Sequence, residues 1–300
     1  MSEQEPAIAQ AESIAALVHP GMRLQAPLAL LPAAARAEGL SLTIAQFAQF
    51  ARYRELLLDW NARFNLTAVT DPIEVERRLF LDGLRLAPAI DRLTSGQAAP
   101  RLLDIGSGGG FPGLVLKIAR PALDVTLVDA TGKKVRFLDE AIAALNLTGA
   151  RALQARAEEI GRDDRFRDAF DLVTARAVAP LPVLLEYAMP LLRVGGVGLF
   201  PKGRDLAAEL AAAETAAAIL GARVESAALL PGGETRLVAA RKQAPTPANY
   251  PRRTGLPSQA PLGRAGAERA AGGRRIRRRA GSPTRASRSD GADLSGRDGP

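Results

Sequence analysis

Asp104-Ile105-Gly106-Ser107-Gly108-Gly109-Gly110-Phe111-Pro112-Gly113 is the stretch of sequence that decides the fold. It follows a short apolar run over residues 101–105 and precedes a segment expected to be a helix. Glycines let the chain turn tightly and approach a ligand closely, and a helix N-terminus attracts negative charge. A glycine-rich loop between a strand and a helix indicates a nucleotide-binding α/β domain.

The acid before the glycines separates the possible ligands. Both dinucleotides and S-adenosyl-L-methionine bind to such loops, so the glycines alone do not decide. A carboxylate at Asp104 would repel a pyrophosphate, whereas it suits the ammonium group of the methionine part of S-adenosyl-L-methionine. Asp129 ends the next expected strand, where a carboxylate can bind ribose hydroxyls. The pattern favours S-adenosyl-L-methionine as the cofactor; the alternatives are NAD, and a plain glycine turn with two surface acids.

The segments around the loop predict the rest of the sheet. From Arg101 onward, short apolar runs alternate with amphipathic segments of helix length, as in a parallel βαβ sheet. Strands are expected at residues 101–105, 125–129, 150–154, 170–174, 197–200, 223–229 and 236–241, and helices at 133–145, 182–192 and 205–220. Pro231, Gly232 and Gly233 lie between the last two strands, which predicts an antiparallel hairpin. The expected fold class is α/β, with a Rossmann-like, seven-stranded doubly wound sheet.

The remaining chain divides into three parts around the α/β domain at 96–243. Residues 1–39 are rich in Ala and Pro and are predicted to form a loosely ordered lead-in. From Ser41, the expected N-cap, apolar residues recur every three or four positions, and a second helical stretch follows Pro72. Residues 40–95 are therefore expected to form a helical cap. Residues 244–300 are mostly Pro, Gly, Ser, Ala and Arg, and are predicted to be a disordered tail.

Composition narrows the function classes. The chain has 300 residues, no cysteine and the single histidine His19, so neither a disulfide framework nor a metal site is expected. Residues 249–300 hold twelve arginines against four acids, which accounts for the whole net charge of +8. Any RNA surface on the body must then be a local patch. No segment predicts a membrane span or a secretory signal, and the expected location is the cytoplasm.

Two later strand ends complete the expected pocket. Arg156-Ala157-Glu158-Glu159 follows the third strand, where this fold offers contacts to an adenine, although an acidic pair that opens a helix also simply complements the helix dipole. Thr174-Ala175-Arg176-Ala177 follows the fourth strand and would face the transferable methyl group. The Asn/Asp-Pro-Pro-aromatic sequence that is usual for exocyclic amine methylation is absent there, which disfavours an amino-group target.

A ring nitrogen with an in-plane lone pair, such as guanine N7, needs no deprotonation before it attacks a sulfonium. No general base is then required, and catalysis rests on holding donor and acceptor in line. Arg176 is the expected catalytic residue, because its guanidinium could bind guanine O6 or a neighbouring phosphate. The alternative is that Arg176 neutralises Asp171.

Four further segments add to these residues. They are Trp60-Asn61-Ala62-Arg63-Phe64-Asn65-Leu66-Thr67, Leu127 to Leu138, Phe200-Pro201-Lys202-Gly203 and Tyr250-Pro251-Arg252-Arg253. In this order and spacing they resemble the ribosomal small-subunit methyltransferase G family, historically called glucose-inhibited division protein B, over about residues 40–264. The resemblance implies a class I methyltransferase fold with an N-terminal helical cap, S-adenosyl-L-methionine as methyl donor, and guanine N7 of 16S rRNA as acceptor.

The motifs and the resemblance together assign residues to the site. The expected donor pocket comprises Asp104, Gly106, Gly108, Phe111, Asp129, Ala130, Thr131, Ala157, Glu158 and Arg176. Arg156, Lys202 and Asn65 are candidates for holding RNA or shaping the pocket; the respective alternatives are a surface charge, a solvated strand end and a helix-ending cap. Many family members carry an Arg-His pair followed by Asp-Ser where this chain has Arg78-Leu79 and Asp82-Gly83, which puts its substrate contacts in question.

The predicted function is transfer of a methyl group from S-adenosyl-L-methionine to guanine N7 of 16S rRNA. The expected partner is 16S rRNA or the small ribosomal subunit, and the expected state is a monomer. Two other classes stay open: a non-catalytic RNA-binding or assembly protein on the same fold, and a methyltransferase with a small-molecule or protein acceptor.

Overall fold

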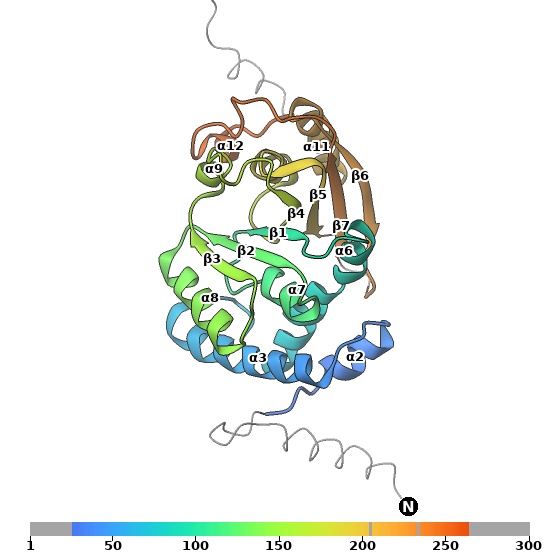
Figure 1. Ribbon diagram of the computed structural model, residues 1–300, viewed down its shortest axis with the longest axis vertical. Coiled ribbons are helices and arrows are strands. Elements are labelled where there is room, and N and C mark those ends of the chain that lie inside the picture. The colour runs from blue at the N-terminus through green and yellow to red at the C-terminus, as the bar shows by residue number, and fades with distance from the viewer. Residues whose placement is uncertain (1–25, 204–205, 233–234, 264–300) are drawn as a thin grey trace, which may run out of the picture.

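A seven-stranded sheet lies at the centre of the computed structural model, which describes residues 26–203, 206–232 and 235–263. The strands are β1 Arg101–Ile105, β2 Asp124–Asp129, β3 Ala150–Gln154, β4 Phe170–Ala175, β5 Leu192–Lys202, β6 Ala222–Leu229 and β7 Arg236–Lys242. Their order is β3-β2-β1-β4-β5-β7-β6 (Figure 1). Neighbours from β3 to β5 are parallel, and β7 is antiparallel to both β5 and β6. The predicted doubly wound sheet that ends in a hairpin is confirmed.

Helices cover both faces of this sheet. The helices are α3 Ile44–Phe64, α7 Gly113–Ala119 and α8 Gly132–Ala144 on one side, and α9 Ala157–Ile160, α10 Leu181–Ala188 and α11 Ala207–Ile219 on the other. Successive side chains of a strand point to opposite faces. Leu102 of β1 therefore lies in the core beneath α3, α7 and α8, whereas Leu103 lies in the core beneath α10 and α11. None of the helices in the described ranges combines the length and the apolar character that a membrane span requires.

Helix α3 is the main element of the predicted cap. Its N-cap is Thr43, because the Thr43 hydroxyl accepts the Gln46 N–H at 3.2 Å while the Gln46 side chain accepts the Thr43 N–H at 2.8 Å. The predicted N-cap, Ser41, is wrong by two residues. The Gln46 amide also donates to the Ile118 carbonyl at 2.7 Å and so joins the start of α3 to the end of α7.

The second helical stretch of the cap is less regular than the apolar pattern predicts. It runs through α4 Pro72–Glu74, the π-helix η1 Val75–Leu81 and α5 Asp82–Leu84, and α6 Ala87–Leu93 follows. A π-helix is rare and frequently lies at a functional site. Apolar spacing does not reveal such a segment, because the pattern fits an α-helix equally well.

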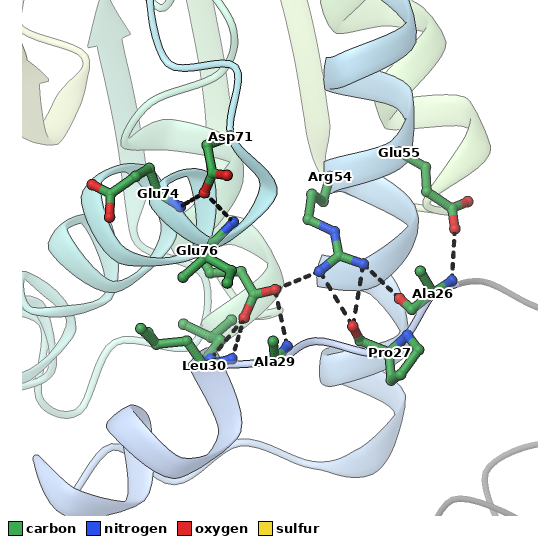
Figure 2. A network of polar contacts seen from close by, with 11 residues as sticks. Ala26, Pro27, Ala29, Leu30, Arg54, Glu55, Asp71, Glu74 and Glu76 are labelled. Atoms are coloured by element: carbon green, nitrogen blue, oxygen red, sulfur yellow. Dashed lines mark hydrogen bonds and ion pairs between the residues drawn. The ribbon is translucent and has the colours of Figure 1, made fainter.

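Residues 26–39 differ from the loosely ordered lead-in predicted for 1–39. They include α2 Leu31–Ala37, and the segment before it is held by Glu76 of η1 (Figure 2). The Glu76 carboxylate accepts the N–H groups of residues 29–31 and pairs with Arg54. Arg54 also donates to the carbonyls of residues 26 and 27. Ion pairing and hydrogen bonds with distant residues order this segment, so the prediction from its composition is wrong for residues 26–39. Residues 1–25 lie outside the described residues.

Residues 244–263 also depart from the prediction, which placed all of 244–300 in a disordered tail. Arg252 is 6% exposed and forms a two-pronged ion pair with the completely buried Glu186 of α10, at 2.8 and 2.6 Å. Arg162 and Arg167 donate to backbone carbonyls of the same segment, which contains α12 Leu256–Gln259. These arginine contacts fix this part of the chain together with Tyr250 and Leu262, which are buried in the core beneath α10 and α11. The rest of the predicted tail, 264–300, is outside the described part.

Candidate functional site

Three strand ends meet at one edge of the sheet. Strand β1 lies between β2 and β4 and is parallel to both, so the residues at their carboxyl ends converge. Asp104 is in register with Leu127 of β2 and Thr174 of β4. The structure therefore brings Asp104, Asp129 and Arg176 to the same edge.

The glycine-rich loop lies close to the loops on either side of it. The Gly108 N–H donates to Asp129 Oδ2 at 3.0 Å, which ties the loop to the end of β2. Gly106 has a φ of +66°, and a Cβ atom there would lie 2.6 Å from Val178 Cγ2 in the loop after β4. A side chain at position 106 would therefore be strained and would displace a segment of the site.

The Asp104 carboxylate is completely buried but only half satisfied. Its Oδ2 atom accepts the Gly113 N–H at 3.1 Å, whereas Oδ1 has no hydrogen-bond partner among the described residues. Burial raises the pKa of Asp104 to about 7 against the opposing effects of the Gly113 N–H and of the Ser107 hydroxyl, which donates to the Asp104 backbone carbonyl at 2.9 Å. The charge of Asp129 raises the pKa further, and that of Arg176 lowers it. A cation bound at Oδ1 would complete the hydrogen bonding of this carboxylate and favour its charged form.

Arg176 lacks a hydrogen-bond acceptor for one of its side-chain nitrogens within the described chain. Its Nη2 atom donates to the Arg78 carbonyl at 2.6 Å and lies 3.4 Å from Asp82 Oδ2. Its Nη1 atom is buried and has no partner in the part of the chain that the structure describes, and burial lowers the pKa of the guanidinium. The alternative role, neutralising Asp171, is wrong, because Asp171 pairs with Arg193 at 2.7 Å.

The bare oxygen of Asp104 and the bare nitrogen of Arg176 are complementary. Each charge shifts the pKa of the other group toward its charged form, yet no hydrogen bond or ion pair joins the two within the described chain. A zwitterion that carries an ammonium and a carboxylate on one carbon would satisfy both groups. The two atoms are therefore candidate contacts for the amino-acid end of a ligand.

Asp129 is 6% exposed and is fixed by the backbone around it. Its Oδ1 atom accepts the Thr131 N–H at 2.9 Å, and Lys134 Nζ lies 3.7 Å from Oδ2. Each carboxylate oxygen can accept a second hydrogen bond. Ala130, between Asp129 and Thr131, is exposed. The end of β2 thus combines a rigid acceptor with an open neighbouring position.

The loop after β3 differs in part from the expectation. Ala157 and Glu158 lie in the first turn of α9, whose N–H groups have no partner within the helix. The buried Glu158 carboxylate, however, accepts the Gly255 N–H at 2.9 Å and a hydrogen bond from the Tyr187 hydroxyl at 3.3 Å. The Glu158 carboxylate therefore contacts the C-terminal segment. What the loop after β3 can offer to a ligand is the backbone N–H groups of this first turn.

Phe111 supports the loop from beneath. It is 8% exposed and stacks on Tyr53 of α3, with ring centroids 5.5 Å apart. The Tyr53 hydroxyl donates to the Gly109 carbonyl, and burial raises the pKa of Tyr53. Tyr53 belongs to the apolar face of the helix predicted after Ser41, and that periodicity does not reveal a bond to the loop. The signal was a lone hydroxyl among the aromatic residues of that face.

Two of the three candidates for RNA contact border this edge of the sheet, since Arg156 directly precedes Ala157 and Lys202 bonds to the loop after β4. Asn65 is exposed, has a φ of 49° and is the C-cap of α3, so the helix-cap alternative describes its place. Arg156 is exposed at the N-cap of α9. Lys202 pairs with Glu209 at 2.5 Å and donates to the Ala179 carbonyl at 3.0 Å, so it is not a solvated strand end.

Comparisons with known proteins agree with one another. The family described as rRNA small subunit methyltransferase G matches residues 46–238 of this chain. "Ribosomal RNA small subunit methyltransferase G" of Chloroflexus aggregans is 51% identical over 228 residues, which are 75% of this chain and 93% of that protein. Its counterpart in a Roseiflexus species is 51% identical over 231 residues, 76% of this chain and 97% of that protein. The counterpart in Moorella thermoacetica is 44% identical over 237 residues, 78% of this chain and 97% of that protein.

Proposed function

Because the chain belongs to the ribosomal RNA small subunit methyltransferase G family, we propose that it transfers a methyl group from S-adenosyl-L-methionine to N7 of a guanine in 16S rRNA. The observation that carries the proposal is the pair of buried atoms Asp104 Oδ1 and Arg176 Nη1, which lack partners among the described residues. They lie at the edge of a sheet whose order, with antiparallel β7, is that of the class I methyltransferase fold.

The bound donor would supply a methyl group on a positively charged sulfur. Asp104 Oδ1 is free to accept a hydrogen bond from its ammonium group, and Arg176 Nη1 is free to donate to its carboxylate. Burial strengthens the attraction of Asp104 for a cation, because water screens the charges less there. Gly106 and Gly108 keep the loop free of side chains, and Phe111 supports it.

The other two strand ends would bind the nucleoside part. Asp129 is fixed by Gly108 and Thr131 and keeps acceptor capacity for ribose hydroxyls. The first-turn N–H groups of Ala157 and Glu158 suit the ring nitrogens of an adenine. Ala130 leaves room beside the ribose site, because it lacks a long side chain.

Methylation at guanine N7 requires positioning and no general base, because the attacking lone pair lies in the ring plane and is free. Alignment of donor and acceptor alone contributes several kcal/mol to such a reaction, and up to about 10 kcal/mol in favourable cases. Arg176 is the residue we assign to this alignment. An Arg176→Ala variant that binds donor but transfers no methyl would place its guanidinium on the guanine; loss of donor affinity would place it on the donor carboxylate.

Exposed cationic side chains near the carboxyl ends of the strands would contact the RNA. Arg156 is exposed, and no carboxylate pairs with its side chain among the residues described, so it is available to a phosphate. Lys202 is engaged by Glu209 and would first have to leave that partner. We therefore rank Arg156 above Lys202 and Asn65 as an RNA contact.

Mass spectrometry of 16S rRNA from a strain that lacks this gene tests the proposal. The expected result is the loss of one 7-methylguanosine, which the purified protein restores on small subunits from that strain. Unchanged 16S methylation would favour a non-catalytic assembly protein. Faster methylation of a small molecule or a protein than of 16S rRNA would favour a different acceptor.

A further inference from the structure

Arg176 is oriented by the helical cap and not by the sheet that carries it. Among the described residues, both of its side-chain hydrogen bonds come from the second helical stretch of the cap: the Arg78 carbonyl in η1, 2.6 Å from Nη2, and Asp82 Oδ2 in α5, 3.4 Å from the same nitrogen. The two contacts hold one end of a rigid, planar guanidinium. The other end, Nη1, is then left pointing away from the cap contacts, buried and with no partner in the described chain.

The π-helix explains why the Arg78 carbonyl can accept this bond. In an α-helix that carbonyl would accept the N–H of Asp82, four residues later. Here the Asp82 N–H instead bonds to the Leu79 carbonyl. At this end of the π-helix the Arg78 oxygen is therefore without the Asp82 N–H and can accept the bond from Arg176, a residue far away in the sequence.

Asp82 supplies the negative charge at this contact. Its Oδ1 atom pairs with Arg85 Nη1 at 2.6 Å, and Arg85 pairs in turn with Glu38 at 2.6 Å. Arg85 thus holds the Asp82 carboxylate from one side while its second oxygen faces Arg176. Removal of the Asp82 charge would leave the largely buried Arg176 with only a backbone oxygen as direct partner.

We propose that Asp82 is a positioning residue for the methyl transfer: with the Arg78 carbonyl, it fixes Arg176 Nη2 so that Nη1 is presented to the donor and acceptor. The helical cap then takes part in the reaction and does more than cover the sheet. The inference rests on the proposed function, since it assigns a purpose to the orientation of Arg176.

Asp82→Asn tests the inference, with Glu38→Gln as the matched control. Both substitutions weaken the same charge network through Arg85, but only Asp82→Asn removes the negative charge beside Arg176. The expected result is a similar change in melting temperature for the two variants, and a loss of roughly tenfold or more in kcat/KM on small subunits for Asp82→Asn alone. Asp82→Glu, which keeps the charge, is expected to recover part of that loss.

A double-mutant cycle separates positioning from a general structural effect. In an Arg176→Ala background, Asp82→Asn is expected to cause little further loss of activity or donor affinity. An Asp82→Asn variant as active as Glu38→Gln, or one whose loss is unchanged in the Arg176→Ala background, would overturn the inference while the proposed function stands. A wild-type chain that neither binds S-adenosyl-L-methionine nor methylates small subunits would overturn both.

Discussion

Glu76 and Asp104 are both completely buried carboxylates, but their surroundings differ. Glu76 accepts hydrogen bonds from three backbone N–H groups and from Arg54, so both of its oxygens are satisfied. Asp104 accepts one backbone N–H and has one bare oxygen within the described chain. Since buried polar groups are nearly always paired in folded proteins, an incomplete one at the carboxyl ends of parallel strands is a candidate ligand contact. The two carboxylates are alike in burial and charge. They differ in whether both oxygens accept hydrogen bonds, and this difference distinguishes the structural carboxylate from the functional one.

The largest effect is expected at the saturated carboxylate. Glu76→Gln leaves the Arg54 guanidinium buried without its countercharge, so we expect a loss of about 3–5 kcal/mol in the free energy of unfolding. Urea denaturation of the variant measures it. Glu55→Gln on α3, the helix of Arg54, is the control, because Glu55 has only partly exposed partners among the described residues, the Ala26 N–H and Arg52. Equal stability of the two variants would contradict a structural role for Glu76.

The next effect is expected at the incomplete carboxylate, and on binding. Asp104→Asn removes the charge that faces the donor ammonium, so we expect the affinity for S-adenosyl-L-methionine to fall roughly 100-fold, as measured by calorimetry. Retention of wild-type affinity by this variant would show that the bare oxygen is not a donor contact.

Asp104→Asn is expected to raise the free energy of unfolding at neutral and higher pH, although it lowers the affinity for the donor. The pKa of Asp104 is about 7 in the folded chain against an ordinary value of 3.8, so the folded state binds more protons than the unfolded state between these values. This group therefore contributes stability at low pH that is lost as the pH rises from about 4 to about 7. Melting curves of wild type and Asp104→Asn should diverge over that window, with the variant the more stable above it. Parallel curves would contradict the assigned burial of a bare carboxylate.

A smaller effect is expected where the cap meets the loop. Tyr53→Phe keeps the aromatic stacking but removes the hydroxyl that donates to the Gly109 carbonyl, so we expect a loss of about 1 kcal/mol in stability. Donor affinity is expected to fall several-fold, because the loop loses one of its supports. A variant with unchanged donor affinity would show that this bond serves folding alone.

The smallest effect is expected at the exposed charges. Arg156→Ala should weaken binding to 16S rRNA a few-fold and lower the slope of log affinity against log salt by about one. Arg36→Ala is the control, since Arg36 is also exposed but lies on α2 in the cap. Filter binding at several salt concentrations measures both, and equal slopes would remove Arg156 from the RNA surface.

Much of the fold follows from the sequence, because strand and helix periods are local properties of the chain. Strands β1 and β3 begin and end where the apolar runs predict, whereas β5 begins five residues earlier than expected, because Arg193, Val194 and two glycines interrupt the apolar run. The ordered segments at 26–39 and 244–263 were missed, since ion pairs between distant residues hold them. The π-helix was missed for a related reason, because the Arg78 carbonyl in it is bonded by Arg176, which is distant in the sequence, and local periodicity does not reveal such a contact.

The candidate site could be predicted in part. The convergence of Asp104, Asp129 and Arg176 follows from the rule that parallel strands end at one edge. What the sequence could not show is which polar atoms remain unpaired. The carboxylate of Glu158, expected at the donor, is taken by Gly255, a residue in a segment that was not expected to fold.

Calorimetric titration of S-adenosyl-L-methionine into the wild-type chain at pH 5.5 and pH 7.5 tests the central claim most directly, with Asp104→Asn alongside. Because the pKa of Asp104 is about 7, its carboxylate is mostly protonated at the lower pH and mostly charged at the higher. The expected result is an affinity roughly tenfold or more weaker at pH 5.5 for wild type, and a weak affinity with little pH dependence for the variant. Equal wild-type affinity at the two pH values, or the same pH dependence in both proteins, would contradict the assignment of Asp104 to the donor.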